Sequence, residues 1–149
     1  MYAEGHGAAQ NYSEAIKWWK KLAEQGAPDS QYNIGNMYFW GTGVEQDYAE
    51  AIRRYIKAAE GGIVDAMFDL GTMYYKGEGT EQDYAEAVRW WKKAAELEDD
   101  EAQYNLGVMY YDVIGVSKNI SKAVEYFRQA AGNGNSNAQS ILKTMNKSW

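Results

Sequence analysis

Residues that could carry catalytic chemistry are sparse in this chain. Its 149 residues include a single histidine, His6, and no cysteine. His6 lies between two glycines in a segment expected to be a loop. The sequence does not place near it the partners that a triad or a metal-bound water would need. We therefore predict that the protein is not an enzyme and that it has no metal site and no cofactor.

Two glycine-rich segments and one acidic run superficially resemble ligand-binding loops. Residues 41–43 (Gly-Thr-Gly) and 77–79 (Gly-Glu-Gly) could suggest phosphate binding. Each follows the expected C-terminus of a helix, whose partial negative charge disfavours phosphate, so we interpret both as helix caps. The acidic run at 96–101 lacks the alternating ligands and central glycine of a calcium loop, and we interpret it as a solvated turn.

Composition and charge narrow the choice of partners. The net charge is −6 and the sequence pI is about 4.8, which disfavours nucleic acid and anionic membranes as partners. No apolar run approaches the roughly 18 residues of a membrane span, so no membrane insertion is expected. Nine cations recur at helical spacing: Lys17, Lys20, Lys21, Arg53, Arg54, Lys57, Arg89, Lys92 and Lys93. We interpret them as a solvated outer face, with contact to an acidic partner as the alternative.

The strongest pattern is a repeat with a constant period. Gly35, Gly71 and Gly107 are equally spaced (71 − 35 = 107 − 71 = 36), and similar motifs surround them. An aromatic residue follows each glycine at a constant distance, giving Tyr55, Trp91 and Phe127 (55 − 35 = 91 − 71 = 127 − 107 = 20). Such a period predicts an array of helical units, none of which can bury its apolar face alone.

Each complete unit is expected to contain two helices. In the unit at 30–65, apolar residues spaced three and four apart predict a first helix that ends at Gly41. Asp47 and Glu50 form a variant capping box, which predicts that the second helix begins at Tyr48. The small residues Ala51, Ala87 and Ala123 on the second helices are expected to face the repeated glycines.

The units are predicted at about 1–29 (partial), 30–65, 66–101, 102–137 and 138–149 (a terminal capping helix), within a single solenoid domain. In the partial first unit, residues 5–7 are expected to form the loop between the two helices. The loop at 112–115 lacks the double glycine and is expected to be less rigid. The missing first helix of the partial unit is either supplied by further repeats upstream, or the apolar end is bare. In the second case Tyr2, Trp18 and Trp19 would be partly exposed and would favour self-association.

These residues resemble the Sel1-like repeat family, a relative of the tetratricopeptide repeats. The matching positions are Ala66, Leu70, Gly71, Tyr74, Gly77, Gly79, Asp83, Ala87, Trp91, Ala94 and Ala95. The resemblance implies an all-α, right-handed superhelical solenoid of antiparallel helix pairs that acts as a scaffold or adaptor for protein partners. It also suggests a bacterial protein, often exported, although this chain shows no signal peptide. Some members with a disulfide in each repeat have been linked to β-lactam binding, a link that transfers poorly to a chain without cysteine.

In such a stack the first helices line a concave groove, and their sequence predicts where a partner would bind. Twelve residues should face the groove: Tyr32, Asn36, Phe39, Trp40, Phe68, Thr72, Tyr75, Lys76, Tyr104, Val108, Tyr111 and Asp112. Positions 32/68/104 and 39/75/111 are always aromatic and could equally serve packing between repeats. Positions 36/72/108 and 40/76/112 vary completely, as expected for a surface that fits an irregular ligand, although drift of a solvent-exposed face would give the same variation.

We therefore predict a non-catalytic interaction scaffold that binds a peptide or protein in this groove through its aromatic side chains. The alternatives are a protein that binds or hydrolyses cell-wall or β-lactam-like substrates, and a helical-repeat RNA-binding protein, which would need a basic groove.

Overall fold

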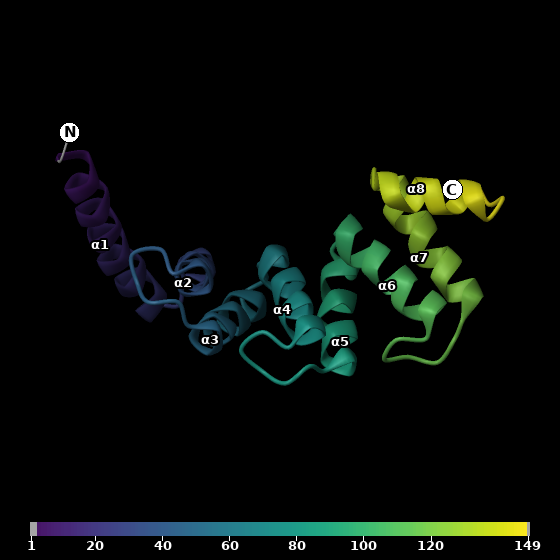
Figure 1. Cartoon of the computed structure of the whole chain (residues 1–149), viewed down its shortest axis with the longest axis horizontal. Helices are drawn as coiled ribbons and strands as arrows, with labels where there is room; N and C mark the ends of the chain where they lie inside the picture. The colour runs from purple at the N-terminus through teal and green to yellow at the C-terminus, as the bar shows by residue number, and fades with distance from the viewer. Residues whose placement is uncertain (1–2, 149) are drawn as a thin grey trace. The chain divides into compact units, whose positions relative to one another are not determined.

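The described part of this protein is built of α-helices. A computed structural model describes the backbone of residues 3–148 and the side chains of residues 11–148, and within that part of the chain there is no strand. The elements are α1 (Ala3–Glu24), α2 (Pro28–Trp40), α3 (Tyr48–Glu60), α4 (Val64–Lys76), α5 (Tyr84–Glu96), α6 (Asp100–Asp112), α7 (Ile120–Gly132) and α8 (Ser136–Thr144), as Figure 1 shows. One compact unit ends at Ala66 and a second begins at Met67. The prediction of an all-α fold is confirmed.

Polar side chains at the helix N-termini determine where the second helices begin. Asp47 Oδ1 accepts a hydrogen bond from the Glu50 N–H at 2.9 Å, and Asp83 does the same for Glu86 at 3.0 Å. Asn119 caps α7 in the same way. The predicted start at Tyr48 is thus confirmed, but the capping box is only half formed. The Glu50 carboxylate turns to arginines further along α3, while the Asp47 N–H donates to the Tyr38 carbonyl at 2.9 Å.

The first helices end in a left-handed residue, as the sequence predicts. Gly41 and Gly77 have φ angles of 67° and 74°, and the Gly77 N–H donates to the Met73 carbonyl at 2.8 Å. These hydrogen bonds confirm that the glycine segments cap helices. Val113 takes the corresponding position after α6 with a φ of 64°. The 112–115 loop therefore has the same helix end as the glycine loops, and its rigidity stays a prediction.

Each repeated glycine makes room for an aromatic ring of the second helix. The prediction that the small residues Ala51, Ala87 and Ala123 face these glycines was wrong. A Cβ on Gly35 would lie 2.6 Å from the Tyr55 ring, and one on Gly107 would lie 2.5 Å from the Phe127 ring. Gly71 faces the Trp91 ring in the same way. These rings are large enough to reach across the helix interface and cover the glycine Cα, which a short alanine side chain cannot do.

The first unit also departs from its prediction. Residues 5–7 belong to the continuous helix α1 and do not form an inter-helix loop. In later units a side chain of the preceding repeat packs on the corresponding loop. A Cβ on Gly43, for example, would lie 3.1 Å from the Tyr12 Cβ. In the continuous helix, residues 5–7 instead satisfy their backbone hydrogen bonds locally.

A repeated glutamine joins each of three first helices to the helix before it. The side-chain amides of Gln31, Gln103 and Gln139 donate to the carbonyls of Ala23, Ala95 and Ala131, respectively, at 3.0, 3.2 and 3.1 Å. Gln31 and Gln103 are buried, so these hydrogen bonds satisfy amides that would otherwise be costly to bury. The equivalent position on α4 is Met67, which cannot donate.

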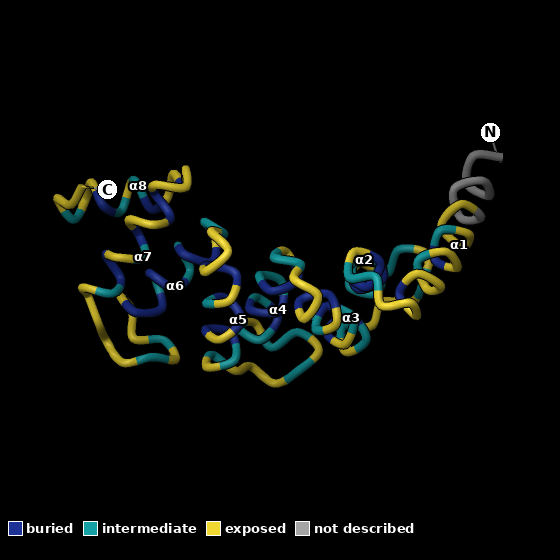
Figure 2. The backbone as a smooth tube through the Cα atoms, turned by 180° about the vertical axis from the view of Figure 1, so that it is seen from behind, coloured by how far each residue is buried: buried dark blue, intermediate teal, exposed yellow. Residues whose placement is uncertain are grey.

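Within the helices, buried stretches of the backbone alternate with intermediate and exposed ones, as the dark, teal and yellow segments of Figure 2 show. In the second unit, Phe127 packs with Val124, Ala138 and Leu142, so that α8 closes the core at the C-terminal end. The predicted terminal helix is therefore present, and its Leu142 is fully buried.

Candidate functional site

The twelve predicted groove residues lie on three first helices. We call them the α2 set (Tyr32, Asn36, Phe39, Trp40), the α4 set (Phe68, Thr72, Tyr75, Lys76) and the α6 set (Tyr104, Val108, Tyr111, Asp112). None of the twelve side chains is fully buried. Trp40, Lys76, Tyr111 and Asp112 are exposed and the others are half-buried, so all twelve have surface available to a ligand.

The α4 set lines a hollow of about 270 Å³, which we call the α4–α6 hollow. Trp91 of α5 forms part of its wall, together with Asn105, Val108 and Met109 of α6. The rings of Tyr75 and Trp91 lie 5.5 Å apart, and the Trp91 Nε1–H donates to the Phe68 carbonyl at 3.2 Å. These contacts hold the tyrosine and the tryptophan in place without a ligand.

The α6 set lines a second hollow of about 370 Å³, the α6–α8 hollow. Its remaining lining residues are Phe127, Ile141, Thr144 and Met145. The Tyr104 ring packs 5.9 Å from the Phe127 ring. Val108 lines both hollows, so the two adjoin along α6.

The α2 set packs mainly on its own unit. Tyr32 and Phe39 lie 5.6 and 6.5 Å from the Tyr55 ring, and the Tyr55 hydroxyl donates to Asn36 Oδ1 at 2.7 Å. Trp40 stands out in this set because 71% of its surface is exposed. Together with Tyr75–Trp91 and Tyr104–Phe127, these contacts show that the repeated aromatics have a packing role within their units.

Lys76 and Asp112 occupy equivalent positions at the C-terminal ends of α4 and α6. Neither forms an ion pair within the part of the chain whose side chains are described. The partial negative charge of a helix C-terminus favours the lysine and disfavours the aspartate. Asp112 is therefore an exposed anion that its own helix does not stabilise.

Sequence reasoning missed a third, larger hollow of about 670 Å³ between α5 and α7. Its charged lining residues have both signs: Lys92, Glu96, Glu98, Lys122, Glu125 and Arg128. The Tyr110 and Tyr126 rings stack nearby at 5.8 Å, and burial, followed by the neighbouring Tyr110, raises the pKa of Tyr126. The sequence signals were Lys92 in the basic stripe and Glu96 and Glu98 in the acidic run, but neither pattern showed that α7 would complete a hollow with them.

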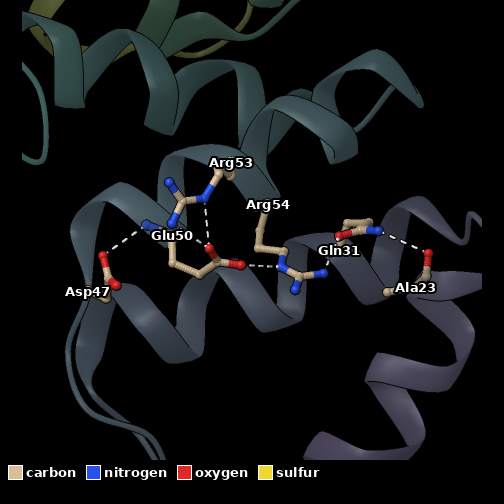
Figure 3. Close-up of polar contacts among 6 residues, drawn as sticks. All are labelled: Ala23, Gln31, Asp47, Glu50, Arg53 and Arg54. Carbon is tan, nitrogen blue, oxygen red and sulfur yellow. Dashed lines mark hydrogen bonds and ion pairs between the residues drawn. The ribbon is translucent and has the colours of Figure 1, made fainter.

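Part of the basic stripe is neutralised within its own helices. Figure 3 shows Glu50 accepting from Arg53 Nε at 2.7 Å and from Arg54 Nε at 2.8 Å. Burial alone would raise the pKa of Glu50, but the hydrogen bonds and charges of the two arginines outweigh it and lower that pKa. Arg89 pairs with Glu86 in the same manner. These pairs favour the interpretation of the stripe as a solvated outer face.

Two of the aromatic residues that the sequence analysis placed at the end of the first repeat lie on α1. Trp18 is 62% exposed and Trp19 is half-buried, whereas Tyr2 lies outside the described residues. Self-association through this end stays a prediction. His6 belongs to α1, and its side chain also lies outside the described part.

The described residues offer neither a cluster for a metal ion nor a helix for a membrane span. No group of three or more histidine, cysteine, aspartate or glutamate side chains there is arranged to hold a metal ion. No helix in the same residues has the length and apolar character that crossing a membrane requires.

Comparisons with known proteins identify the repeat. A family model described as Sel1 repeat matches residues 1–26, 28–63, 64–99 and 100–135. The crystal structure of a protective antigen of uropathogenic Escherichia coli strains, described as displaying an SLR fold, is 41% identical with a TM-score of 0.83, and the match covers 85% of this chain and 27% of that one. A Sel1 repeat protein from Oxalobacter formigenes is 40% identical with a TM-score of 0.81 over 95% of this chain and 58% of its own length.

A third structure, cysteine-rich protein B of Helicobacter pylori, shares the fold with a TM-score of 0.70 at 24% identity, over 91% of this chain and 97% of its own. No curated protein matches this sequence. The chain thus spans about a quarter of the length of the Escherichia coli antigen and somewhat more than half of the length of the Oxalobacter formigenes protein.

Proposed function

The chain belongs to the Sel1 repeat family, and we propose that it is a non-catalytic interaction module that binds a peptide segment of a protein partner on its first helices. Proteins of this family are generally protein-interaction scaffolds and generally non-catalytic. The specific proposal is that the α4 and α6 sets form the binding surface of the compact unit that begins at Met67. The α2 set, with Trp40 as its main contact, forms the binding surface of the compact unit that ends at Ala66.

One observation supports this proposal above the others. All eight residues of the α4 and α6 sets line two adjoining hollows, although they were selected from the sequence only by register. Apolar hollows with a few polar groups at their edges are typical of peptide-binding surfaces. Tyrosine is well suited to such a surface because it buries a large area while losing little conformational entropy.

The proposal is tested by affinity capture of partners with two matched double variants. Trp40 and Tyr111, which are 71% and 46% exposed, are replaced by alanine in the test variant. The control variant replaces Trp18 and Tyr12, which are 62% and 46% exposed but lie on α1. We expect the test variant to lose partners that the wild type and the control variant both retain, by about tenfold or more if these aromatics are interface hot spots.

Partners retained equally by all three proteins would contradict the proposal. Circular dichroism of each variant verifies the fold, which should be unchanged because all four replaced side chains are exposed. Gel filtration of the control variant shows separately whether the bare end of α1 mediates self-association.

A further inference from the structure

The two adjoining hollows carry opposite charges at equivalent places. Lys76 lines the α4–α6 hollow and Asp112 lines the α6–α8 hollow, one repeat apart (112 − 76 = 36). Both side chains are exposed, and neither has an internal ion-pair partner among the described side chains. A ligand that extends past Val108 from one hollow to the other would therefore meet a cation and then an anion.

The α6–α8 hollow has several features that favour a cationic side chain. Asp112 supplies a full negative charge, and the C-terminus of α6 adds the partial negative charge of the helix dipole. The Tyr104 and Tyr111 side chains line the same hollow and can offer their π faces to a guanidinium or ammonium group. These features act together on one charge sign, so this hollow suits an arginine or lysine of the ligand.

The α4–α6 hollow has the opposite preference. Lys76 is its charged residue, and Asn105 adds a side-chain amide that can donate to a carboxylate. The Thr72 hydroxyl already donates to the Phe68 carbonyl at 3.1 Å, so it offers mainly its acceptor oxygen. An aspartate or glutamate of the ligand would gain from Lys76 and Asn105.

The distance between the two charges limits how they can be matched. Packed helices lie on the order of 10 Å apart, and an extended chain advances about 3.3 Å per residue. Equivalent positions on two neighbouring first helices therefore correspond to about three residues of an extended peptide.

We propose that this surface recognises an extended peptide that has one acidic and one basic side chain about three residues apart, the acidic one in the α4–α6 hollow and the basic one in the α6–α8 hollow. This inference rests on the proposed function and specifies its ligand. It also predicts a direction, because exchanging the two protein charges reverses the order of charges that the ligand must have.

Selection from a phage-displayed random peptide library tests the inference on the whole chain. The wild type is compared with the exchange variant Lys76→Glu/Asp112→Lys, and with a control exchange on α3, Lys57→Glu/Glu60→Lys, whose residues are also exposed. All three proteins have the same net charge. We expect the wild type and the control to enrich peptides with one order of acidic and basic residues, and the exchange variant to enrich the opposite order.

Fluorescence anisotropy with one synthetic peptide of each order then measures the discrimination. Each peptide should prefer its matching protein by about fivefold or more, as expected for exposed ion pairs, and the preference should fall as salt is raised. Selected peptides without a charge order, or with an order that the exchange leaves unchanged, would overturn the inference. If such peptides still lose binding in Tyr111→Ala, the proposed function survives alone; if they do not, both proposals are wrong.

Discussion

Val113 has a backbone conformation that its side chain disfavours. Its φ of 64° lies in the left-handed region, where a β-branched residue crowds its own backbone at a cost of roughly 1–2 kcal/mol. The two equivalent positions in earlier units are Gly41 and Gly77, which have no Cβ. Val113 is also 51% exposed, so its side chain gains little from burial that would offset this strain.

We therefore expect Val113→Gly to stabilise the protein by about 1 kcal/mol, measured as the free energy of unfolding in urea. The gain is reduced in part because glycine is also more flexible in the unfolded chain. The matched control is Gly77→Val, which introduces the same backbone strain after α4 and also places a Cβ 3.1 Å from the Gln82 backbone nitrogen, so it should destabilise by at least that amount. A Val113→Gly variant no more stable than the wild type would show that the loop relieves the strain in another way.

Both unusual residues at the end of α6 adjoin the proposed binding surface. Asp112 lies at the helix end that disfavours an anion, and Val113 follows it in a strained conformation. Local rules of this kind are broken most often where a residue serves binding rather than stability. This coincidence agrees with a role for Asp112 in ligand recognition.

In the compact unit that ends at Ala66, polar side chains link the three successive helices α1, α2 and α3. The Ala23 carbonyl of α1 accepts from Gln31 of α2, whose Oε1 accepts from Arg54 of α3 at 3.3 Å. Arg54 in turn donates to Glu50, as Figure 3 shows. Glu50 therefore holds the arginine in the position from which it reaches α2.

This network makes the stability of the compact unit that ends at Ala66 depend on pH. The pKa of Glu50 in the folded protein is below its ordinary value of 4.5, so its contribution is complete above about pH 4.5 and is lost as the pH falls through the lowered pKa. We expect Glu50→Gln to destabilise by about 1 kcal/mol or less at pH 7, because the arginine partners are partly exposed. The difference from the wild type should shrink as the pH is lowered below about 4.5.

Urea unfolding of both proteins at a series of pH values measures this difference. Glu86→Gln is the matched control on α5, because among the described side chains Glu86 pairs with one arginine, Arg89, and not with two. Its effect at pH 7 should be smaller than that of Glu50→Gln. A pH-independent difference between wild type and Glu50→Gln would mean that the arginines do not stabilise the Glu50 charge.

The sequence allowed the elements to be predicted better than the contacts between them. The caps at Asp47 and Gly41 are local signals, so the helix ends could be predicted. The partner of each repeated glycine depends on side-chain reach across a helix pair, so the ring of Tyr55 was not distinguished from Ala51. The α5–α7 hollow and the Gln31 link were missed for the same reason, since both depend on how the side chains of different helices meet and not on a local signal.

At the scale of the whole molecule, the chain is an array of helical repeats, and the two hollows of the proposed surface lie in its C-terminal repeats. Every residue that lines the α4–α6 and α6–α8 hollows lies between Phe68 and Met145. The fully buried residues Leu70, Leu106, Phe127 and Leu142 also lie there. In a repeat protein each unit contacts only its neighbours, and stability is approximately a sum over units and their interfaces.

We therefore expect a fragment of residues 64–149, which begins at the first residue of α4, to fold without the first 63 residues. Circular dichroism should show a helical protein that unfolds cooperatively in urea. Its m-value should be about three fifths of that of the whole chain, because it has 86 of the 149 residues (149 − 64 + 1 = 86). The fragment should bind the peptide selected by the wild type within about twofold, since the hollows retain all their lining residues. A folded fragment that no longer binds that peptide would show that residues outside the two hollows, such as Trp40 of the α2 set, supply most of the affinity.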